Sequence, residues 1–159
     1  MRMNRVADRL PALLTFLIGL ILTLLPLPSI IDPFRPSWIA LLIIFWAIYS
    51  PQIWSVGSAW IIGIFIDVTQ GSFLGQHALA FSFIAFITIR FHLIIRFFPL
   101  LQLTFTILPI LAIYQFLLFW INGVGDNNAP LLNYWGPVIS STALWPFILI
   151  SLSGLRNRI

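Results

Sequence analysis

The charged residues of this chain are so few that they leave five long uncharged runs, which constrain the fold more than any other feature. A helix needs about 20 apolar residues to cross a bilayer. Only 8% of the 159 residues are charged, whereas soluble domains carry about 25%. So few charges cannot cover a soluble fold, and the sequence predicts a single all-α integral membrane domain over residues 1–159. The uncharged runs are 10–31, 36–66, 68–89, 97–125 and 127–155.

The second run is broken at its centre by the sequence Tyr49-Ser50-Pro51-Gln52. Proline removes a helix hydrogen bond and disfavours a helical conformation in the residue before it. We therefore expect two short helices separated by a tight turn, and a transmembrane bundle of six helices. Both short helices need burial against neighbours or local thinning of the bilayer. The expected spans are roughly 10–30, 37–50, 52–67, 77–95, 97–121 and 133–153.

The arginines favour six spans over five, because arginine accumulates on the cytoplasmic side of membrane proteins. Five spans would place Arg90 and Arg96 outside, whereas six leave only Arg35 there. The sequence thus predicts a multi-pass protein with both termini in the cytoplasm. On that side Arg90 and Arg96 would anchor to lipid headgroups or form a docking site. The arginines that six spans place in the cytoplasm are Arg2, Arg5, Arg9, Arg90, Arg96, Arg156 and Arg158.

One polar segment interrupts the apolar sequence, D-V-T-Q-G-S-F-L-G-Q-H at positions 67–77. Aspartate, glutamine and histidine are costly near lipid and need a packing, binding or relay role there. Two glycines permit an unusual turn or a close backbone approach. The candidate residues for binding a partner or a ligand are Asp67, Gly71, Gly75, Gln76 and His77.

Three interpretations of this segment remain open. Ala59, Gly63 and Asp67 share one helix face, and small residues let another helix approach closely. The segment could then be a close helix hairpin in which Asp67 bonds free amides. It could instead be a re-entrant turn that faces a cavity or a partner. A proton relay through Asp67 and His77 is the weakest, because no acidic group lies deeper.

The chain offers little that indicates catalysis, a cofactor or a metal. It has no cysteine and two histidines that are fifteen residues apart, which argues against a metal site. Ser72 and His77 lie near an aspartate, but proximity in sequence is poor evidence for a triad. Known catalytic motifs are missing, as is a basic patch interleaved with aromatics for nucleic acid. We expect a protein that is not an enzyme and binds no cofactor.

Three segments, 35–51, 63–81 and 90–102, resemble the rod shape-determining MreD family in order and spacing. The most specific part is D-x-x-x-G-x-x-x-G-Q-H, which begins at Asp67. The resemblance implies a bacterial inner-membrane subunit of the cell-elongation complex that supports lateral peptidoglycan synthesis and rod shape. It also implies MreC, a single-span periplasmic protein, as partner, together with RodA, its partner transpeptidase and, indirectly, MreB. The implied fold is similar to the six-helix substrate-binding subunits of energy-coupling-factor transporters.

Two mechanisms fit this reading of the residues. In the first, the small faces of the third and fourth spans and the polar segment between them position the span of the partner. In the second, the chain is a small-molecule or lipid-binding subunit. Asp67, Gln76 and His77 would then line a pocket that is open to the periplasm.

Overall fold

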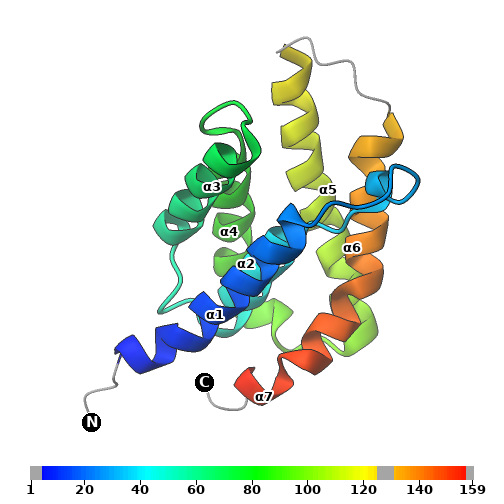
Figure 1. The fold of residues 1–159 in the computed structure, drawn as a ribbon. Helices are drawn as coiled ribbons and strands as arrows, with labels where there is room; N and C mark the ends of the chain where they lie inside the picture. The colour runs from blue at the N-terminus through cyan, green and yellow to red at the C-terminus, as the bar shows by residue number, and fades with distance from the viewer. Residues whose placement is uncertain (1–4, 125–130, 157–159) are drawn as a thin grey trace.

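The computed structural model describes residues 5–124 and 131–156, and every regular element within these two ranges is helical. The prediction of an all-α protein is therefore confirmed. A 3-10 turn, η1 (Asp32–Phe34), precedes the second helix, and a short helix, α7 (Ser153–Arg156), follows the sixth (Figure 1). The long helices are α1 (Arg5–Leu24), α2 (Trp38–Tyr49), α3 (Val56–Gln70), α4 (Gln76–Ile95), α5 (Leu100–Val124) and α6 (Leu131–Ser151).

The predicted break at Pro51 is confirmed, because α2 ends at Tyr49 and α3 begins at Val56. The start of α3 lies later than the expected residue 52. Ser55 caps the helix: its side chain accepts a hydrogen bond from the backbone N–H of Ser58, and the Ser58 hydroxyl accepts one from the backbone N–H of Ser55. Such a capping box satisfies amides that the first helical turn leaves free, and it fixes the helix start.

Helix α1 ends at Leu24, earlier than the predicted span end at residue 30. The Arg35 guanidinium donates hydrogen bonds to the carbonyl oxygens of Thr23 at 2.6 Å and Leu25 at 2.9 Å. It also pairs with Asp32 at 2.9 Å. A cation at a helix C-terminus satisfies free carbonyls and the helix dipole, so Arg35 joins the end of α1 to η1.

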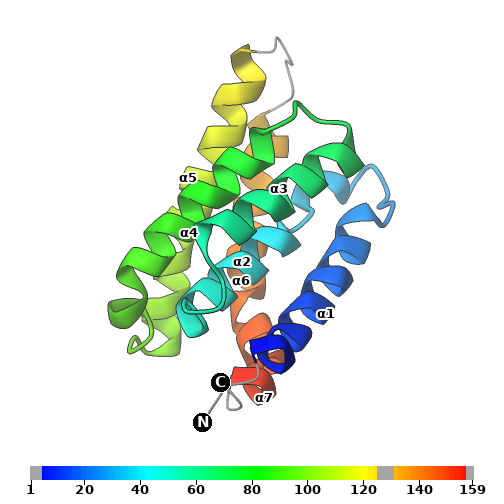
Figure 2. The same ribbon diagram turned by 90° about the vertical axis from the view of Figure 1, so that its left-hand side faces the viewer.

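Helix α2 is the core of the bundle. Residues 39–49 are all buried, and the helix is apolar on every side. A helix that is apolar all round belongs in an interior, and α2 runs through the middle of the molecule, packed on α1, α4 and α6 (Figure 2). Its 12 residues span only about 18 Å. Protein rather than lipid covers its sides, so of the two expected ways to accommodate a short helix, α2 uses burial against its neighbours.

Helices α3 and α4 form a close antiparallel hairpin. The buried residues of α3 are Ala59, Gly63, Ile66 and Asp67, which confirms the predicted face. A β-carbon at Gly63 would overlap the backbone of Ala78 on α4. The small face of α3 is thus covered by α4 of the same chain. The expectation that this face receives the span of a partner protein is wrong.

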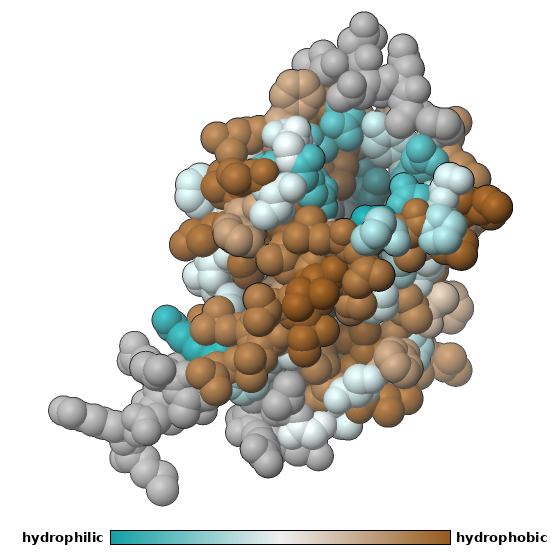
Figure 3. Space-filling view, in the orientation of Figure 1, coloured by the Kyte–Doolittle hydropathy of each residue, from teal (hydrophilic) through white to brown (hydrophobic). Residues whose placement is uncertain are grey.

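The outer surface is apolar around its middle, as the brown belt in Figure 3 shows. Among the described residues, Gln76–Ile95 and Leu100–Gly123 are long and apolar enough to cross a membrane, while Arg9–Leu24 and Val56–Gln70 are apolar but shorter. The start of α1 and α7 lie at one end of the molecule. The α3–α4 loop and the tip of α5 lie at the other (Figures 1 and 2).

Candidate binding site at the α3–α4 loop

Asp67, in the last turn of α3, organises the whole loop. The residue is 1% exposed. Its Oδ1 accepts hydrogen bonds from the backbone N–H of His77 at 3.0 Å and from the Ser72 hydroxyl at 2.8 Å. Its Oδ2 accepts from the N–H groups of Gly75 at 2.8 Å and Ala78 at 3.5 Å. These amides belong to the first turn of α4, where a helix has no internal acceptors, so Asp67 caps α4 from the preceding helix.

The close-hairpin interpretation is therefore confirmed. Of the second interpretation, the re-entrant path is wrong, but the loop does face a cavity, which Gly71, Ser72 and Phe73 line. The polar segment consists of the last turn of α3, the loop 71–75 and the first turn of α4. It does not fold back into the bundle. The two glycines are needed because Gly71 has φ 64° and Gly75 has φ 98°, in the left-handed region that side chains with a β-carbon disfavour.

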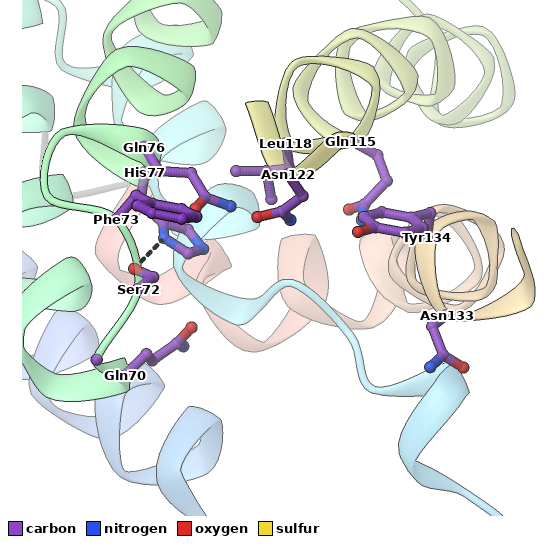
Figure 4. A pocket seen from close by; sticks show the side chains of 11 residues that line it. Gln70, Ser72, Phe73, Gln76, His77, Gln115, Leu118, Asn122, Asn133 and Tyr134 are labelled. Atoms are coloured by element: carbon purple, nitrogen blue, oxygen red, sulfur yellow. Dashed lines mark hydrogen bonds between the residues drawn. The ribbon is translucent and has the colours of Figure 1, made fainter. Parts of the chain in front are cut away.

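Ser72, His77 and Asp67 come together, but not as a nucleophilic triad. In a triad the carboxylate bonds one ring nitrogen of histidine and the nucleophile bonds the other. Here His77 Nδ1 lies 2.8 Å from Asp67 Oδ1 and 3.4 Å from Ser72 Oγ (Figure 4). Both groups share one nitrogen, and the Ser72 hydroxyl donates to Asp67. The cluster holds the loop in shape and leaves the serine without a base.

A polar cavity of about 540 Å³ opens beside this loop. One wall carries Gln76 and His77 from the start of α4, and the opposite wall carries Gln115 of α5 and Tyr134 of α6 (Figure 4). Hydrophilic residues gather around a hollow at this end of the molecule (Figure 3). The described residues that line it are Gln70, Gly71, Ser72, Phe73, Gln76, His77, Gln115, Leu118, Asn122, Asn133 and Tyr134.

Of the candidate residues identified from the sequence, some line the cavity and others only shape the loop beside it. Gly71, Gln76 and His77 line the cavity, whereas Asp67 lies behind the wall with both carboxylate oxygens already bonded. Gly75 shapes the turn and does not line the cavity. Gln115, which is buried, was missed in the sequence analysis. The only signal in the sequence was a glutamine within the apolar run 97–125, and the exposed Gln102 in the same run gives the same signal.

Arg90 and Arg96 lie near the far end of α4, away from the cavity. Both side chains are exposed, and the Arg96 guanidinium lies 5.9 Å from the centre of the Tyr49 ring. At that distance a guanidinium is attracted to the ring face. The structure therefore gives the chain two separate polar regions, one at each end of the apolar belt.

Comparison with known proteins identifies the family. The model of the rod shape-determining protein MreD matches residues 3–153. The chain is also 25% identical over 147 residues to the rod shape-determining protein MreD of Haemophilus influenzae, covering 91% of this chain and 89% of that protein. No solved structure matches, so the similarity to transporter subunits stays a prediction. Because the family model spans nearly the whole chain, this membrane protein belongs to the MreD family of rod shape-determining proteins.

Proposed function

We propose that this chain is a non-enzymatic, multi-pass subunit of the bacterial inner membrane that binds MreC and supports lateral peptidoglycan synthesis. The observation that carries the proposal is the family match over residues 3–153. The described bundle adds a physical reason. In the cluster of Asp67, Ser72 and His77, the carboxylate caps α4. Ser72 and Asp67 both contact the same ring nitrogen of His77. That geometry supports a binding role more than a catalytic one.

The loop 71–75 is the surface that we propose for MreC. Phe73 is 53% exposed and Leu74 is 72% exposed at the tip of the hairpin. Exposed apolar side chains on a rigid, capped loop are typical of surfaces that contact another protein. The loop is fixed by Asp67, so little conformational freedom is lost when a partner binds.

The proposed orientation places both termini in the cytoplasm. The described ends of the chain, at the start of α1 and at α7, lie at the same end of the molecule. Arg90 and Arg96 lie toward that end, and arginine marks the cytoplasmic side. The α3–α4 loop would then face the periplasm, where the family resemblance puts most of MreC. Arg90 and Arg96 would bind lipid headgroups, or they would form a docking site for RodA, its transpeptidase and, indirectly, MreB.

Replacing Gly71 or Gly75 with leucine should weaken capture of MreC at least severalfold while membrane insertion persists. Nothing lies within 4 Å of a β-carbon at either position, so the effect comes from backbone strain of about 1–2 kcal/mol rather than a clash. Co-purification of tagged MreC with each variant measures the loss.

Gly71→Asn is the matched control, because asparagine tolerates the left-handed conformation. It should capture MreC nearly as well as the unaltered chain. Equal capture by the leucine and asparagine variants would show that the shape of this loop does not matter to the partner.

A second candidate function is the binding of a small molecule or a lipid headgroup, and the cavity favours it. At about 540 Å³ its volume lies within the range of about 300–1,000 Å³ that is usual for ligand pockets. Of the residues expected as ligands, Gln76 and His77 line the cavity, and Asp67 acts through His77 and Ser72. Native mass spectrometry that finds a stoichiometric bound mass would support this function.

A further inference from the structure

The polar part of the cavity lining is neutral and dominated by carboxamides. Five of the eleven lining residues are glutamine or asparagine, and none is aspartate, glutamate, lysine or arginine. A carboxamide offers two N–H donors and a carbonyl acceptor side by side. A hydroxyl group likewise both donates and accepts. A ligand with hydroxyl groups can therefore donate hydrogen bonds to these carboxamides and also accept hydrogen bonds from them.

Within the described part of the chain, the fixed charge beside the cavity argues against ionic ligands of either sign. Asp67 lies behind His77 and its carboxylate would repel an anion that entered the cavity. Among the described residues around the cavity, a cation finds no free carboxylate oxygen, because both oxygens of Asp67 already accept bonds from Ser72, His77, Gly75 and Ala78. The cavity is thus built for an uncharged molecule.

Two buried glutamines supply the specific hydrogen-bonding groups. Gln76 and Gln115 are each 6% exposed and face the cavity from opposite walls (Figure 4). The Oε1 atom of Gln76 is buried, and no donor among the described residues bonds it. An acceptor buried without a partner costs about 1–3 kcal/mol. This oxygen has almost no accessible surface, so a ligand hydroxyl recovers that free energy only when the carboxamide of Gln76 turns its oxygen toward the cavity.

The histidine and the aromatic residues complete the match. Nδ1 of His77 is directed to the Asp67 carboxylate, so the proton resides on Nδ1 and Nε2 is left as an acceptor in the neutral ring. Phe73 and Tyr134 add apolar ring surface on opposite sides. Tyr134 is held by an edge contact with Phe119, at 5.1 Å between ring centres. Flat apolar surface beside paired donors and acceptors suits a ring that carries C–H groups on its faces and hydroxyls at its edge.

We propose that this cavity binds an uncharged, polyhydroxylated ring, a neutral sugar, either free or as the headgroup of a glycolipid. The proposal rests on the second candidate function and names its ligand class. Both sources share the same chemistry. A headgroup would bring its own anchor in the bilayer, and a free saccharide would arrive from water.

Saturation-transfer NMR on the full chain in nanodiscs tests the proposal with trehalose, glucuronate and glucosamine as probes. We expect a signal from trehalose and at least tenfold weaker signals from the two charged sugars. Gln115→Leu should reduce the trehalose signal about tenfold, and Asn122→Leu, at another lining residue, should reduce it severalfold. Gln102→Leu changes the same residue type on the same helix, at an exposed position outside the cavity, and should leave the signal unchanged.

Nanodiscs that contain a neutral glycosyl diacylglycerol distinguish the two sources. If the headgroup is the ligand, this lipid displaces trehalose and co-purifies with the chain; if not, trehalose binding persists. A stronger signal from a charged sugar would overturn the neutral class while leaving ligand binding intact. No signal from any probe, or equal signals from Gln115→Leu and Gln102→Leu, would overturn the site. Capture of MreC, measured in parallel, reports separately on the first proposed function.

Discussion

Asp67→Asn should destabilise the α3–α4 hairpin more than any other conservative change in the chain. The substitution keeps the shape but replaces one acceptor oxygen with an N–H₂ donor. That donor would face either the His77 ring and the Ser72 hydroxyl or the N–H groups of Gly75 and Ala78. Buried donors that lose a charged acceptor each cost about 1–3 kcal/mol. We expect the free energy of unfolding to fall by about 3 kcal/mol or more.

Unfolding in mixed micelles of detergent and sodium dodecyl sulfate measures this loss. Asp32→Asn is the matched comparison, because Asp32 pairs with Arg35 on the surface and its side chain is 56% exposed. Exposed pairs contribute at most about 1 kcal/mol, so Asp32→Asn should remain near the unaltered protein. Similar losses for the two variants would contradict the role assigned to Asp67.

Gly63→Ala should be among the most damaging additions of a single methyl group. A β-carbon at this position overlaps the Cα and N atoms of Ala78. Backbone atoms cannot move aside as a flexible side chain does, so the two helices must separate. Overpacking of this kind costs about 1–3 kcal/mol, and separation also lengthens the bonds from Asp67 to the amides of α4. The same unfolding assay measures the effect.

Gly57→Ala provides the paired control on the same helix. The nearest atom to a β-carbon there is Ser55 Oγ at 3.6 Å, an ordinary contact. Alanine favours a helix over glycine by about 1 kcal/mol, so Gly57→Ala should be neutral or slightly stabilising. Loss of stability at Gly57 equal to that at Gly63 would mean that helix propensity, not close packing, governs this hairpin.

Local features of the fold could be predicted from the sequence because their causes are local. Pro51 breaks the second run through its missing N–H and its steric effect on Ser50. The small face of α3 follows from the spacing of Ala59, Gly63 and Asp67. The use of that face could not be predicted, because small residues invite any helix and do not indicate whether it comes from the same chain.

The cavity could not be predicted in the same way. Gln115 and Tyr134 belong to α5 and α6, and they meet the α3–α4 loop only through long-range packing. The central position of α2 could not be predicted from the sequence either, because an apolar helix has the same composition whether lipid or protein surrounds it. Of the residues around the cavity, only those of the polar segment 67–77 could be identified from the sequence, through its aspartate and glycines.

Single-cysteine labelling with a membrane-impermeant maleimide tests the central claim, that the α3–α4 loop is the periplasmic contact for MreC. The chain has no cysteine, so Leu74→Cys and Phe97→Cys each introduce one thiol, at positions 72% and 84% exposed. We predict that cells with a permeable outer membrane label position 74, that co-produced MreC suppresses this labelling, and that position 97 reacts only after lysis. Labelling of position 97 from outside, or of position 74 at the same rate with and without MreC, would contradict the account.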